Sequence, residues 1–570
     1  MIPRPALGDE TVILNIVLNH VDQGEYFVVM IDRGDFLVRT EDLRAMGLRR
    51  LEGKAYEIGG ETYLQLSSIP EVEVTFDEPT LSLRIVAVPS YFEKHVLDIR
   101  PPRRSDVREP SDTSAFLNYA LTYTSLSSAS SQVEISQELG VRYGEALFLS
   151  DSIYTGGDQA DGFVRLMSRA IYDRRRRFQR LIVGDFLASS GNIGNSMNVG
   201  GLSVQKVYQM DPHLIPYPTP SVSGAVTFPS RMEVFLDGLR IRQETLAPGD
   251  FDLRNLSIGA GAGVAEIVLT DPFGNEQRIV RPFYLSNSLL NPGLHEYSYN
   301  IGVLRTNFGR ESFSYDGLVL SGFHRYGVNE SVTAAFQMET LKQQYNAGPS
   351  ASIRVRPGGV VTVSLAQNRN ADGKFGAAGR IGYLYQSRLF SANLSVGGFH
   401  RHYASVSADP ADAAEQYEVT GGAGYNISRL GSVTVNFEVA GRYEGPDRQA
   451  VTLGYSRQLS KNLSLTARVQ WANEAESAME VMAGLVYIPG RQISVSTRYR
   501  RTDEAHAATI QVQKNPPLGE GFGGRVLVEQ DDATDTTVDA FLQYNARYGA
   551  YRGSYRSFGG DRTLQAAAAG

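Results

Sequence analysis

Residues 463–471 read LSLTARVQW, and their pattern guides the interpretation of the rest of the chain. Apolar and polar side chains alternate at every step of this stretch. Because successive side chains of a β-strand point to opposite faces, a period of two predicts a strand with one apolar and one polar face. The apolar face holds Leu463, Leu465, Ala467, Val469 and Trp471, and the polar face holds Ser464, Thr466, Arg468 and Gln470.

The same alternation recurs along most of the chain. It is clear in residues 297–303, 433–439 and 493–500, and Gly, Asn, Asp or Pro separates one such segment from the next. We expect about six strands before residue 218 and about eighteen after residue 288, each near the 9–11 residues that a tilted membrane-spanning strand needs. No apolar run approaches the roughly 18 residues of a transmembrane helix, so the sequence predicts none.

Alternation alone fits two architectures. Soluble β-sandwiches pack their apolar faces inward, whereas an outer-membrane barrel turns its apolar face to lipid. Stacked sandwiches would need a linker about every hundred residues, and residues 294–570 contain none. A closed barrel needs no linker and leaves no unpaired edge. We therefore predict an all-β fold dominated by a transmembrane barrel of about 24 strands, which is wide enough to need a plug.

The composition excludes several classes of function. The 570 residues include 55 Lys+Arg and 62 Asp+Glu, a net charge of −7 that argues against a nucleic-acid partner. There is no cysteine, which excludes disulfides, thiolate catalysis and Cys-ligated metals. We find no GxxxxGK[ST] loop and no Ser/His/Asp set, so we expect no nucleotide, no cofactor and no enzymatic activity. His400 and His402 share one side of a strand but lack a third ligand, so we expect no metal site.

Pattern shifts divide the chain into five segments. In the first, Thr40 is expected to cap a short helix over residues 41–46 that Gly47 ends. The fourth opens with a Pro/Ser-rich stretch and contains short strands and an Asp-Gly turn, as expected of a compact all-β insert of plug size. The segments are a small α+β domain at 1–95, a linker at 96–112, barrel strands at 113–218, the insert at 219–287 and further barrel strands at 288–570.

The insert and its flanks carry a family resemblance. Residues 234–256 read VFLDGLRIRQETLAPGDFDLRNL, residues 271–277 read DPFGNEQ, and residues 281–305 read RPFYLSNSLLNPGLHEYSYNIGVLR. Residues 181–191 (LIVGDFLASSG) and 216–224 (PYPTPSVSG) add to it. Together these stretches resemble the fimbrial outer-membrane ushers of the chaperone–usher pathway, over nearly the whole chain and in the family's order.

The resemblance implies a division of labour. An N-terminal periplasmic domain would receive periplasmic chaperone–pilus subunit complexes, and a 24-stranded barrel in outer-membrane lipid would export the pilus subunits. The insert would be the plug that closes this pore. The chain departs from the family at both ends. Residues 563–570 are expected to lie inside the last barrel strand, with the family's two C-terminal domains absent, and residues 1–10 lack an aromatic residue, which resembles the divergent, archaic-type ushers.

Because a plug must be held reversibly, we expect its charged residues to pair with charges of the lumen; the alternative is that they are solvated surface charges. In residues 407–416, Asp409 at an N-cap and Pro410 at the first helical position predict a short helix near the plug, although an outer loop is an equal alternative. The predicted plug and gating residues are Asp237, Gly238, Arg240, Arg242, Glu244, Pro248, Gly249, Phe251, Asp252, Arg254, Asp271, Gly274, Asp409 and Pro410.

The sequence leaves the docking residues and two alternative functions open. Docking residues for the chaperone–subunit complex lie within the first domain and are not identified by the sequence. Another plugged outer-membrane transporter is one alternative function. A soluble multidomain β adhesin is the other.

Overall fold

The computed structural model describes most of the chain in two compact units. One unit comprises residues 1–103 and 219–285, and the other comprises residues 104–218 and 286–570. Within the described ranges, no helix is long and apolar enough to cross a membrane. The description omits residues 1–9, 32–33, 50, 99–111, 128–130, 158–161, 192–193, 212–213, 220, 237–238, 257–260, 274, 356–357, 407–414, 428–429, 475–476, 491 and 533–534.

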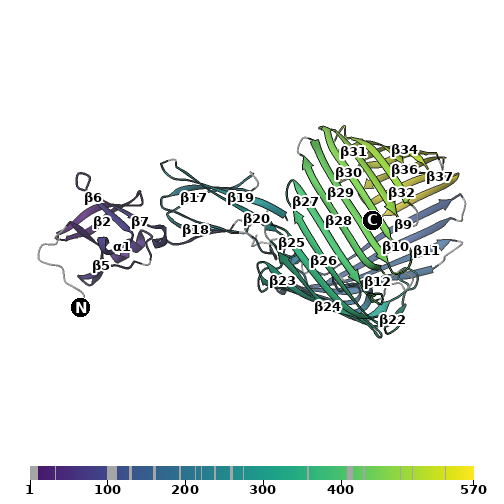
Figure 1. Ribbon diagram of the computed structural model, residues 1–570, viewed down its shortest axis with the longest axis horizontal. Coiled ribbons are helices and arrows are strands. Elements are labelled where there is room, and N and C mark those ends of the chain that lie inside the picture. Colours follow the sequence, from purple (N-terminus) through teal and green to yellow (C-terminus); the bar gives the residue numbers. More distant parts are fainter. Residues whose placement is uncertain are drawn as a thin grey trace. The chain divides into compact units, whose positions relative to one another are not determined.

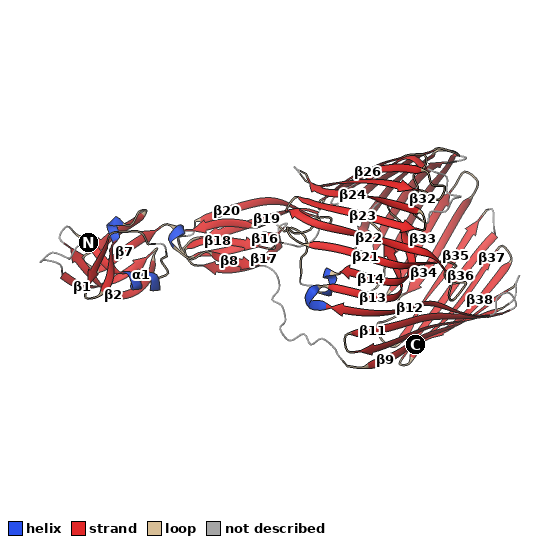
Figure 2. Cartoon of the chain, turned by 90° about the horizontal axis from the view of Figure 1, so that it is seen from below, coloured by secondary structure: helices blue, strands red, loops and turns tan. Residues whose placement is uncertain are grey.

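The larger unit is a closed barrel of 24 strands, which confirms the predicted fold class (Figures 1 and 2). Six of the strands, β9 to β14, precede the insert, and eighteen, β21 to β38, follow it. Neighbours along the chain pair antiparallel, and β14 pairs with β21 across the insert. The strands are β9 Ser114–Leu126, β10 Gln132–Tyr143, β11 Ala146–Gly157, β12 Gly162–Arg174, β13 Gln179–Ser189, β14 Ser196–Lys206, β21 His295–Arg305, β22 Tyr315–Asn329, β23 Val332–Leu341, β24 Gln344–Arg354, β25 Val360–Arg369, β26 Phe375–Gln386, β27 Phe390–Phe399, β28 Glu415–Ile427, β29 Gly431–Arg442, β30 Arg448–Ser460, β31 Leu463–Asn473, β32 Ser477–Tyr487, β33 Ile493–Arg501, β34 His506–Lys514, β35 Gly521–Asp531, β36 Asp535–Ala546, β37 Gly549–Phe558 and β38 Asp561–Ala569, with short 3-10 helices η3 (Arg175–Arg177) and η4 (Tyr208–Met210).

The last strand closes the barrel. β38 pairs with β37 on one side and with β9 on the other, from Thr563 opposite Leu126 to Ala569 opposite Ala120. Figure 2 shows the C-terminus beside β9. The stretch that we expected inside the last barrel strand lies in β38, and this strand closes the barrel. Closure satisfies the backbone hydrogen bonds of both edges, as lipid requires.

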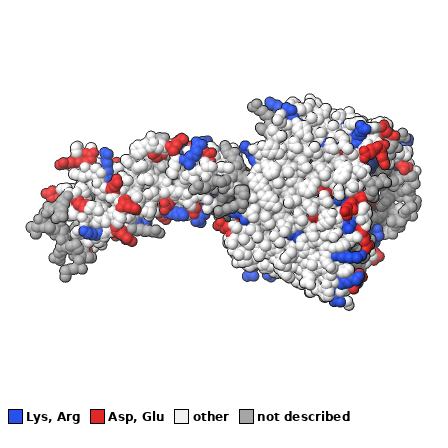
Figure 3. All heavy atoms as spheres, in the orientation of Figure 1, with Lys and Arg blue, Asp and Glu red and all other residues white. Residues whose placement is uncertain are grey.

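The two faces of the barrel wall differ as the alternation predicts. On β34, Ile510 and Val512 point outward and are 49% and 46% exposed. On the inner face, side chains form cross-strand ion pairs, such as Arg468 with Glu480 at 2.7 Å and Arg525 with Asp539 at 2.6 Å. In Figure 3 the wall that faces the viewer is mostly free of charged side chains, which gather toward the rims. An apolar exterior and a polar interior are typical of barrels in outer membranes.

The first domain is built on one seven-stranded sheet, in the order β4-β5-β3-β2-β1-β7-β6. Its core contains Leu14, Ile16, Leu37 and Leu83, all at most 1% exposed. Its elements are β1 Glu10–Leu18, β2 Val21–Ile31, β3 Asp35–Arg39, α1 Thr40–Ala45, β4 Ala55–Ile58, β5 Glu61–Gln65, η1 Leu66–Ser68, β6 Val72–Asp77, β7 Ser82–Ala87 and η2 Pro89–Tyr91.

The short helix exists, but its predicted cap is wrong. Arg39, not Thr40, occupies the N-cap position, and no side chain caps the helix. The hydroxyl of Thr40 is buried without a hydrogen-bond partner, whereas Arg39 is anchored by Asp42 at 2.7 Å. Gly47, with φ of +97°, follows the helix as predicted, because this backbone conformation suits glycine.

The inserted domain is a small β-sandwich of two sheets. One sheet has the order β15-β18-β8 and the other β17-β16-β19-β20. Its elements are β8 His95–Asp98, β15 Val222–Val226, β16 Ser230–Leu236, β17 Leu239–Leu246, β18 Gly249–Arg254, β19 Gly261–Thr270 and β20 Glu276–Leu285. We expected a linker from residue 96, but β8 pairs in parallel with β18. The segment that leaves the first domain is therefore a strand of the inserted domain before it reaches the undescribed residues 99–111.

Candidate functional site

The turn between β1 and β2 joins the first domain to the inserted domain. Asn19 is fully buried, and its amide nitrogen donates hydrogen bonds to the carbonyl oxygens of Ala87 at 2.9 Å and Thr227 at 2.7 Å. The backbone nitrogen of Ala87 donates to the Asn19 amide oxygen at 2.8 Å. Asn19 has a φ of +45°, a conformation that asparagine adopts more readily than most residues. One side chain thus holds backbone groups of both domains.

Aromatic rings reinforce this turn. The ring of His20 makes edge-on contacts with Phe228 at 4.8 Å and Phe273 at 5.1 Å between centroids, and the two Phe rings lie 5.5 Å apart. Edge-to-face packing at such distances contributes roughly 0.5–1.5 kcal/mol per pair beyond burial. Both phenylalanines belong to the inserted domain, so the cluster adds an apolar contact beside the hydrogen bonds of Asn19.

Four predicted residues of the insert form contacts near β8 and among themselves. Arg242 donates to the Asp98 carbonyl at 2.8 Å and forms an ion pair with Glu244 at 2.7 Å. Asp252, whose side chain is 9% exposed, pairs with Arg254 at 2.7 Å and Lys94 at 3.5 Å. We call these contacts, together with the Asn19 turn and the His20 cluster, the domain junction.

The electrostatics of Asp252 favour its charged form. Burial alone would raise the pKa of the Asp252 carboxyl group, but the hydrogen bond and charge of Arg254, with Lys94 and Ser223, outweigh it and hold the pKa below its ordinary value. Asp252 therefore remains an acceptor for its cationic neighbours under all but acidic conditions. The predicted pairing of Arg242, Asp252 and Arg254 with lumen charges stays a prediction, because the structure shows their contacts only within their own unit.

The other predicted residues fall into separate places. Phe251 is fully buried in the sandwich core, and Pro248 is buried beside Gly249. Gly249 has a φ of +137°, and a side chain there would crowd Phe92 and Glu93 at 3.1 Å. Arg240 pairs with Glu233 at 2.8 Å, and Asp271 accepts the backbone N–H groups of Phe273 and Asn275 at 2.9 and 2.8 Å within a turn. The predicted residues that lie outside the described ranges are Asp237, Gly238, Gly274, Asp409 and Pro410.

The expected helix over residues 407–416 is wrong at its end. Both Glu415 and Gln416 belong to β28, and Glu415 is paired with Arg442 of β29 in the barrel wall. The register of this pairing shifts between Glu415 and Tyr417, at the start of the strand. Residues 407–414 lie outside the described ranges, so the cap formed by Asp409 and Pro410 stays a prediction.

In the barrel, the hairpin of β13 and β14 leaves the wall and turns into the lumen. β12 pairs with β13 only up to Gly184, and β21 pairs with β14 only from Val199. Beyond these points β13 and β14 pair with each other alone, to Ser189 opposite Ser196. Apolar residues of the freed part pack with Val319 and Leu341 of the neighbouring wall. We call residues 185–191 and 194–198 the inturned hairpin.

Three glycines lie side by side where the hairpin bends. Gly184 of β13 is opposite Gly201 of β14, which is opposite Gly302 of β21. Gly184 has a φ of +114°, and a Cβ atom there would collide with the Ser168 carbonyl. Cβ atoms at Gly201 and Gly302 would also meet backbone of the neighbouring strand. The close backbone approach that creates the bend therefore requires glycine in this row.

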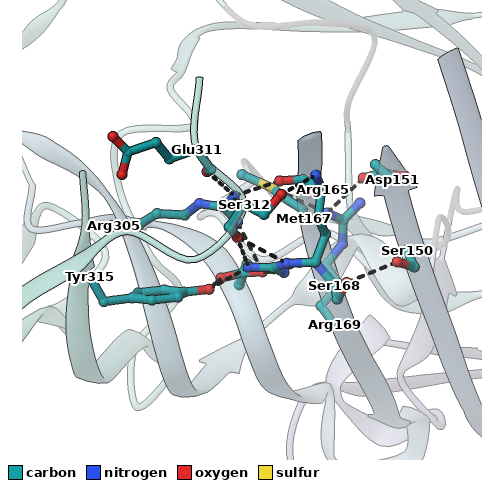
Figure 4. A network of polar contacts seen from close by, with 11 residues as sticks. Ser150, Asp151, Arg165, Met167, Ser168, Arg169, Arg305, Glu311, Ser312 and Tyr315 are labelled. Atoms are coloured by element: carbon teal, nitrogen blue, oxygen red, sulfur yellow. Dashed lines mark hydrogen bonds and ion pairs between the residues drawn. The ribbon is translucent and has the colours of Figure 1, made fainter. Parts of the chain in front are cut away.

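A polar network holds the base of the inturned hairpin (Figure 4). The Asp185 carboxylate forms ion pairs with Arg165 of β12 and with Arg305 of β21, the latter at 3.2 Å. Tyr315 donates its hydroxyl to Asp185 at 2.6 Å, and the backbone N–H of Ser168 donates at 2.9 Å. The Arg305 side chain is 0% and Asp185 4% exposed, so these charges depend on one another.

A second network holds the hairpin tip. The Glu339 carboxylate on the inner face of β23 is 1% exposed. One oxygen accepts the Ser190 hydroxyl at 2.6 Å and the Asn195 N–H at 2.9 Å, both from the tip. The other accepts the Asn346 amide at 3.0 Å and the Val406 N–H at 2.9 Å. Glu339 therefore joins the tip to the segment that leads into residues 407–414.

Sequence reasoning missed the residues that organise these contacts. Asp185 stands within LIVGDFLASSG, which we used only as a resemblance, although a lone acid among apolar residues is a signal in itself. Glu339 looks like any polar position of an alternating strand, and Asn19 like any turn residue. Among the described residues no group of three or more His, Asp or Glu could hold a metal ion.

Comparison with known proteins places this arrangement in a family. The chain matches the description "Outer membrane usher protein" over residues 165–570. It is 22% identical over 415 residues to the F1 capsule-anchoring protein of Yersinia pestis, covering 66% of this chain and 49% of that protein. The chain spans about half the length, or less, of the curated relatives it matches.

Solved structures agree with the fold. A P pilus tip assembly intermediate of E. coli that contains PapC, PapD, PapK and PapG matches with a TM-score of 0.63 at 14% identity, covering 98% of this chain and 74% of that chain. The translocation pore of the P pilus usher PapC matches with a TM-score of 0.51 at 12% identity, covering 80% of this chain and 98% of that chain. At such identity these structures show the fold. The family match covers most of the sequence, and the chain belongs to the outer membrane usher family.

Proposed function

We propose that this outer-membrane barrel is the export pore of a chaperone–usher system, and that the inserted domain is its plug. The observation that supports the proposal best is the position of that domain. A folded sandwich lies in the chain between β14 and β21, two strands that pair directly in the wall, from Val199 opposite Leu304 to Gln205 opposite Ser298. The barrel is thus continuous without the domain, as expected of a plug that can be displaced.

In this proposal the first domain faces the periplasm and receives chaperone–pilus subunit complexes. Subunits that lack a strand exchange the chaperone's strand for that of the next subunit, which is β-augmentation between chains. By holding one complex at the first domain and another at the pore, the protein would raise their effective concentration. Its activity is assembly and export without bond chemistry, and strand exchange supplies the free energy.

The first domain offers a surface for such docking. Ile13 of β1 and Phe27 of β2 are opposite each other in the sheet and are 52% and 64% exposed. An adjacent exposed pair of large apolar side chains is a feature of protein–protein contact sites. We assign the docking of the chaperone–subunit complex to this face of the domain.

Planar-bilayer conductance tests the pore. The variant lacks residues 219–285 and retains the segments on either side, which can form the turn between β14 and β21. We expect the intact chain to be mostly closed and the deletion variant to give large, stable openings. A matched control carries a short Gly/Ser insertion in the turn at Lys461–Asn462 and should behave as the intact chain. Equal conductance of the intact chain and the deletion variant would refute the role of the domain as a plug.

A further inference from the structure

A groove of about 600 Å³ lies on the outer face of the wall near the closing strand. Outward side chains that line it include Val526 of β35, Leu542 of β36 and Leu564 of β38. Two glycines, Gly524 and Gly553, also line it, so side-chain bulk is missing where a lipid-facing strand would otherwise carry it. Gly553 has nothing within 4 Å of the position of a Cβ atom, which shows that the groove is open there.

A lysine marks one end of this groove. Ile510, Val512 and Lys514 share the outward face of β34, and Lys514 is opposite Gly524 in the pairing with β35. Within the part of the chain that the structure describes, the Lys514 ammonium group makes no ion pair. The outward positions around it on β35 to β37 hold glycine, aliphatic and aromatic residues and no carboxylate. The groove is thus apolar along its length and cationic at one end.

The cationic end coincides with an aromatic belt. Phe522, Tyr544 and Tyr551 are opposite one another on the outward face of three neighbouring strands. The Phe522 and Tyr544 rings lie 4.5 Å apart, and Tyr551 is 52% exposed. Aromatic girdles mark the level of the lipid head groups on membrane barrels. Lys514 is therefore placed at head-group depth, with the apolar groove on its hydrocarbon side.

The rim at which this end lies follows from strand direction. β14 and β34 are separated by an even number of places in the barrel order and so run in the same direction. The end of β34 lies at the rim where the chain leaves β14 for the inserted domain. In the proposed function this rim is periplasmic, so the lipid leaflet beside Lys514 is the inner leaflet.

We propose that this groove binds one anionic glycerophospholipid. An acyl chain lies over Gly524 and Gly553, and the head-group phosphate accepts hydrogen bonds from the Lys514 ammonium group, whose aliphatic stem lies along the wall. The lipid fills a region of missing bulk beside the alanine-rich strand that closes the barrel. The choice of leaflet rests on the proposed function, whereas binding itself does not.

The test is native mass spectrometry of the delipidated full-length chain, with phosphatidylglycerol added back in detergent. Lys514→Gln removes the charge, and Gly553→Leu fills the groove without strain at a position open to a side chain. Lys461→Gln, in another turn at the same rim, is the control for charge. Gly398→Leu, at another open glycine on the outward face of β27, is the control for bulk. Heat-modifiable mobility on gels confirms that each variant is folded.

We expect the intact chain to retain one phosphatidylglycerol, with at least fivefold weaker binding in Lys514→Gln and in Gly553→Leu and less than twofold change in the controls. Phosphatidylcholine should bind more weakly than phosphatidylglycerol, and glycerophosphate without acyl chains should not compete. Unchanged binding in both test variants would overturn the proposal. Loss of phosphatidylglycerol binding in Lys514→Gln alone, or competition by glycerophosphate, would indicate a phosphate site without a groove and would also overturn the proposal. A dimer of the intact chain that Gly553→Leu abolishes would overturn it too, because a second copy would then cover the groove. The planar-bilayer conductance experiment tests only the role of the inserted domain as a plug, so its failure would not change the lipid-binding results expected here.

Discussion

The substitution Asp185→Asn tests whether one carboxylate holds the inturned hairpin in the lumen. Asparagine has nearly the same shape, but its single amide oxygen can replace only one of the two carboxylate oxygens, of which one accepts the Tyr315 hydroxyl and the other the Ser168 N–H. The change therefore removes the charge and one of these two hydrogen bonds. It leaves two guanidinium groups without their counter-charge, Arg305 at 0% and Arg165 at 13% side-chain exposure. Breaking a buried ion pair by removing one partner costs about 3–5 kcal/mol. At about 1.4 kcal/mol per factor of ten, local opening of the inturned hairpin becomes about 10²- to 4 × 10³-fold more frequent.

Hydrogen exchange followed by mass spectrometry measures this opening directly. Peptides that cover the inturned hairpin should exchange faster by that factor in the variant, while peptides from β29 to β33 should not change. The control is Asp173→Asn, whose ion pair with Arg180 at 2.7 Å has side chains 23% and 34% exposed. A pair of that exposure contributes at most about 1 kcal/mol, so exchange should change less than about fivefold. An acceleration below threefold in Asp185→Asn would refute the reasoning.

The remaining predictions concern the first domain and its junction with the insert. Asn19→Ala removes three hydrogen bonds of a fully buried side chain. We expect the free energy of unfolding of the unit that contains the first and inserted domains, measured in urea, to fall by about 3 kcal/mol. An unchanged free energy of unfolding would show that the domain junction does not contribute to stability. Because the folded-state pKa of Asp252 is lowered, its contribution is complete above its unfolded pKa of about 3.9 and is lost as pH falls through the folded value. The difference in urea midpoint between the intact chain and Asp252→Asn should therefore be present at neutral pH and vanish in strong acid, and a pH-independent difference would contradict this. Phe27→Ser should weaken capture of a chaperone–subunit complex at least tenfold in a surface-binding assay. Leu81→Ser should not weaken it, although the Leu81 side chain is exposed to a similar extent, at 57%.

Alternation predicted the barrel because it is a local property that each strand carries in its own sequence. The stretch from Leu463 to Trp471 needs no partner to show which of its faces is apolar, and the count of such stretches agrees with the 24 strands. The same pattern cannot show where a strand leaves the wall. β13 and β14 keep pairing with each other beyond Gly184, so the bend changes their outer neighbours without changing their alternation.

The contacts of the candidate site were beyond sequence reasoning for a different reason. Asp185 and Arg305 are 120 positions apart, and only the completed barrel brings their strands together. The charged residues of the insert were expected to pair with charges of the lumen, and that pairing stays a prediction. In the structure Arg242 contacts Asp98 of β8. The Pro- and Arg-rich composition of the residues after β8 led us to interpret this strand as part of a linker. Thr40 was misassigned because the helix begins one residue earlier than expected, so Thr40 lies within the first turn and Arg39 occupies the N-cap position.

The closing ladder also has a consequence for how this protein is made. The backbone nitrogen of Arg562 donates to the Ser127 hydroxyl at 2.8 Å across 435 positions of sequence. Bringing such distant segments together is entropically costly and slow, and the cost precedes any gain from the contacts. Until β38 is delivered, β9 exposes an unpaired edge that can join strands of other chains. The pairing of β38 with β9 therefore joins the most distant segments of the barrel, and the edge of β9 is exposed to aggregation until that pairing forms.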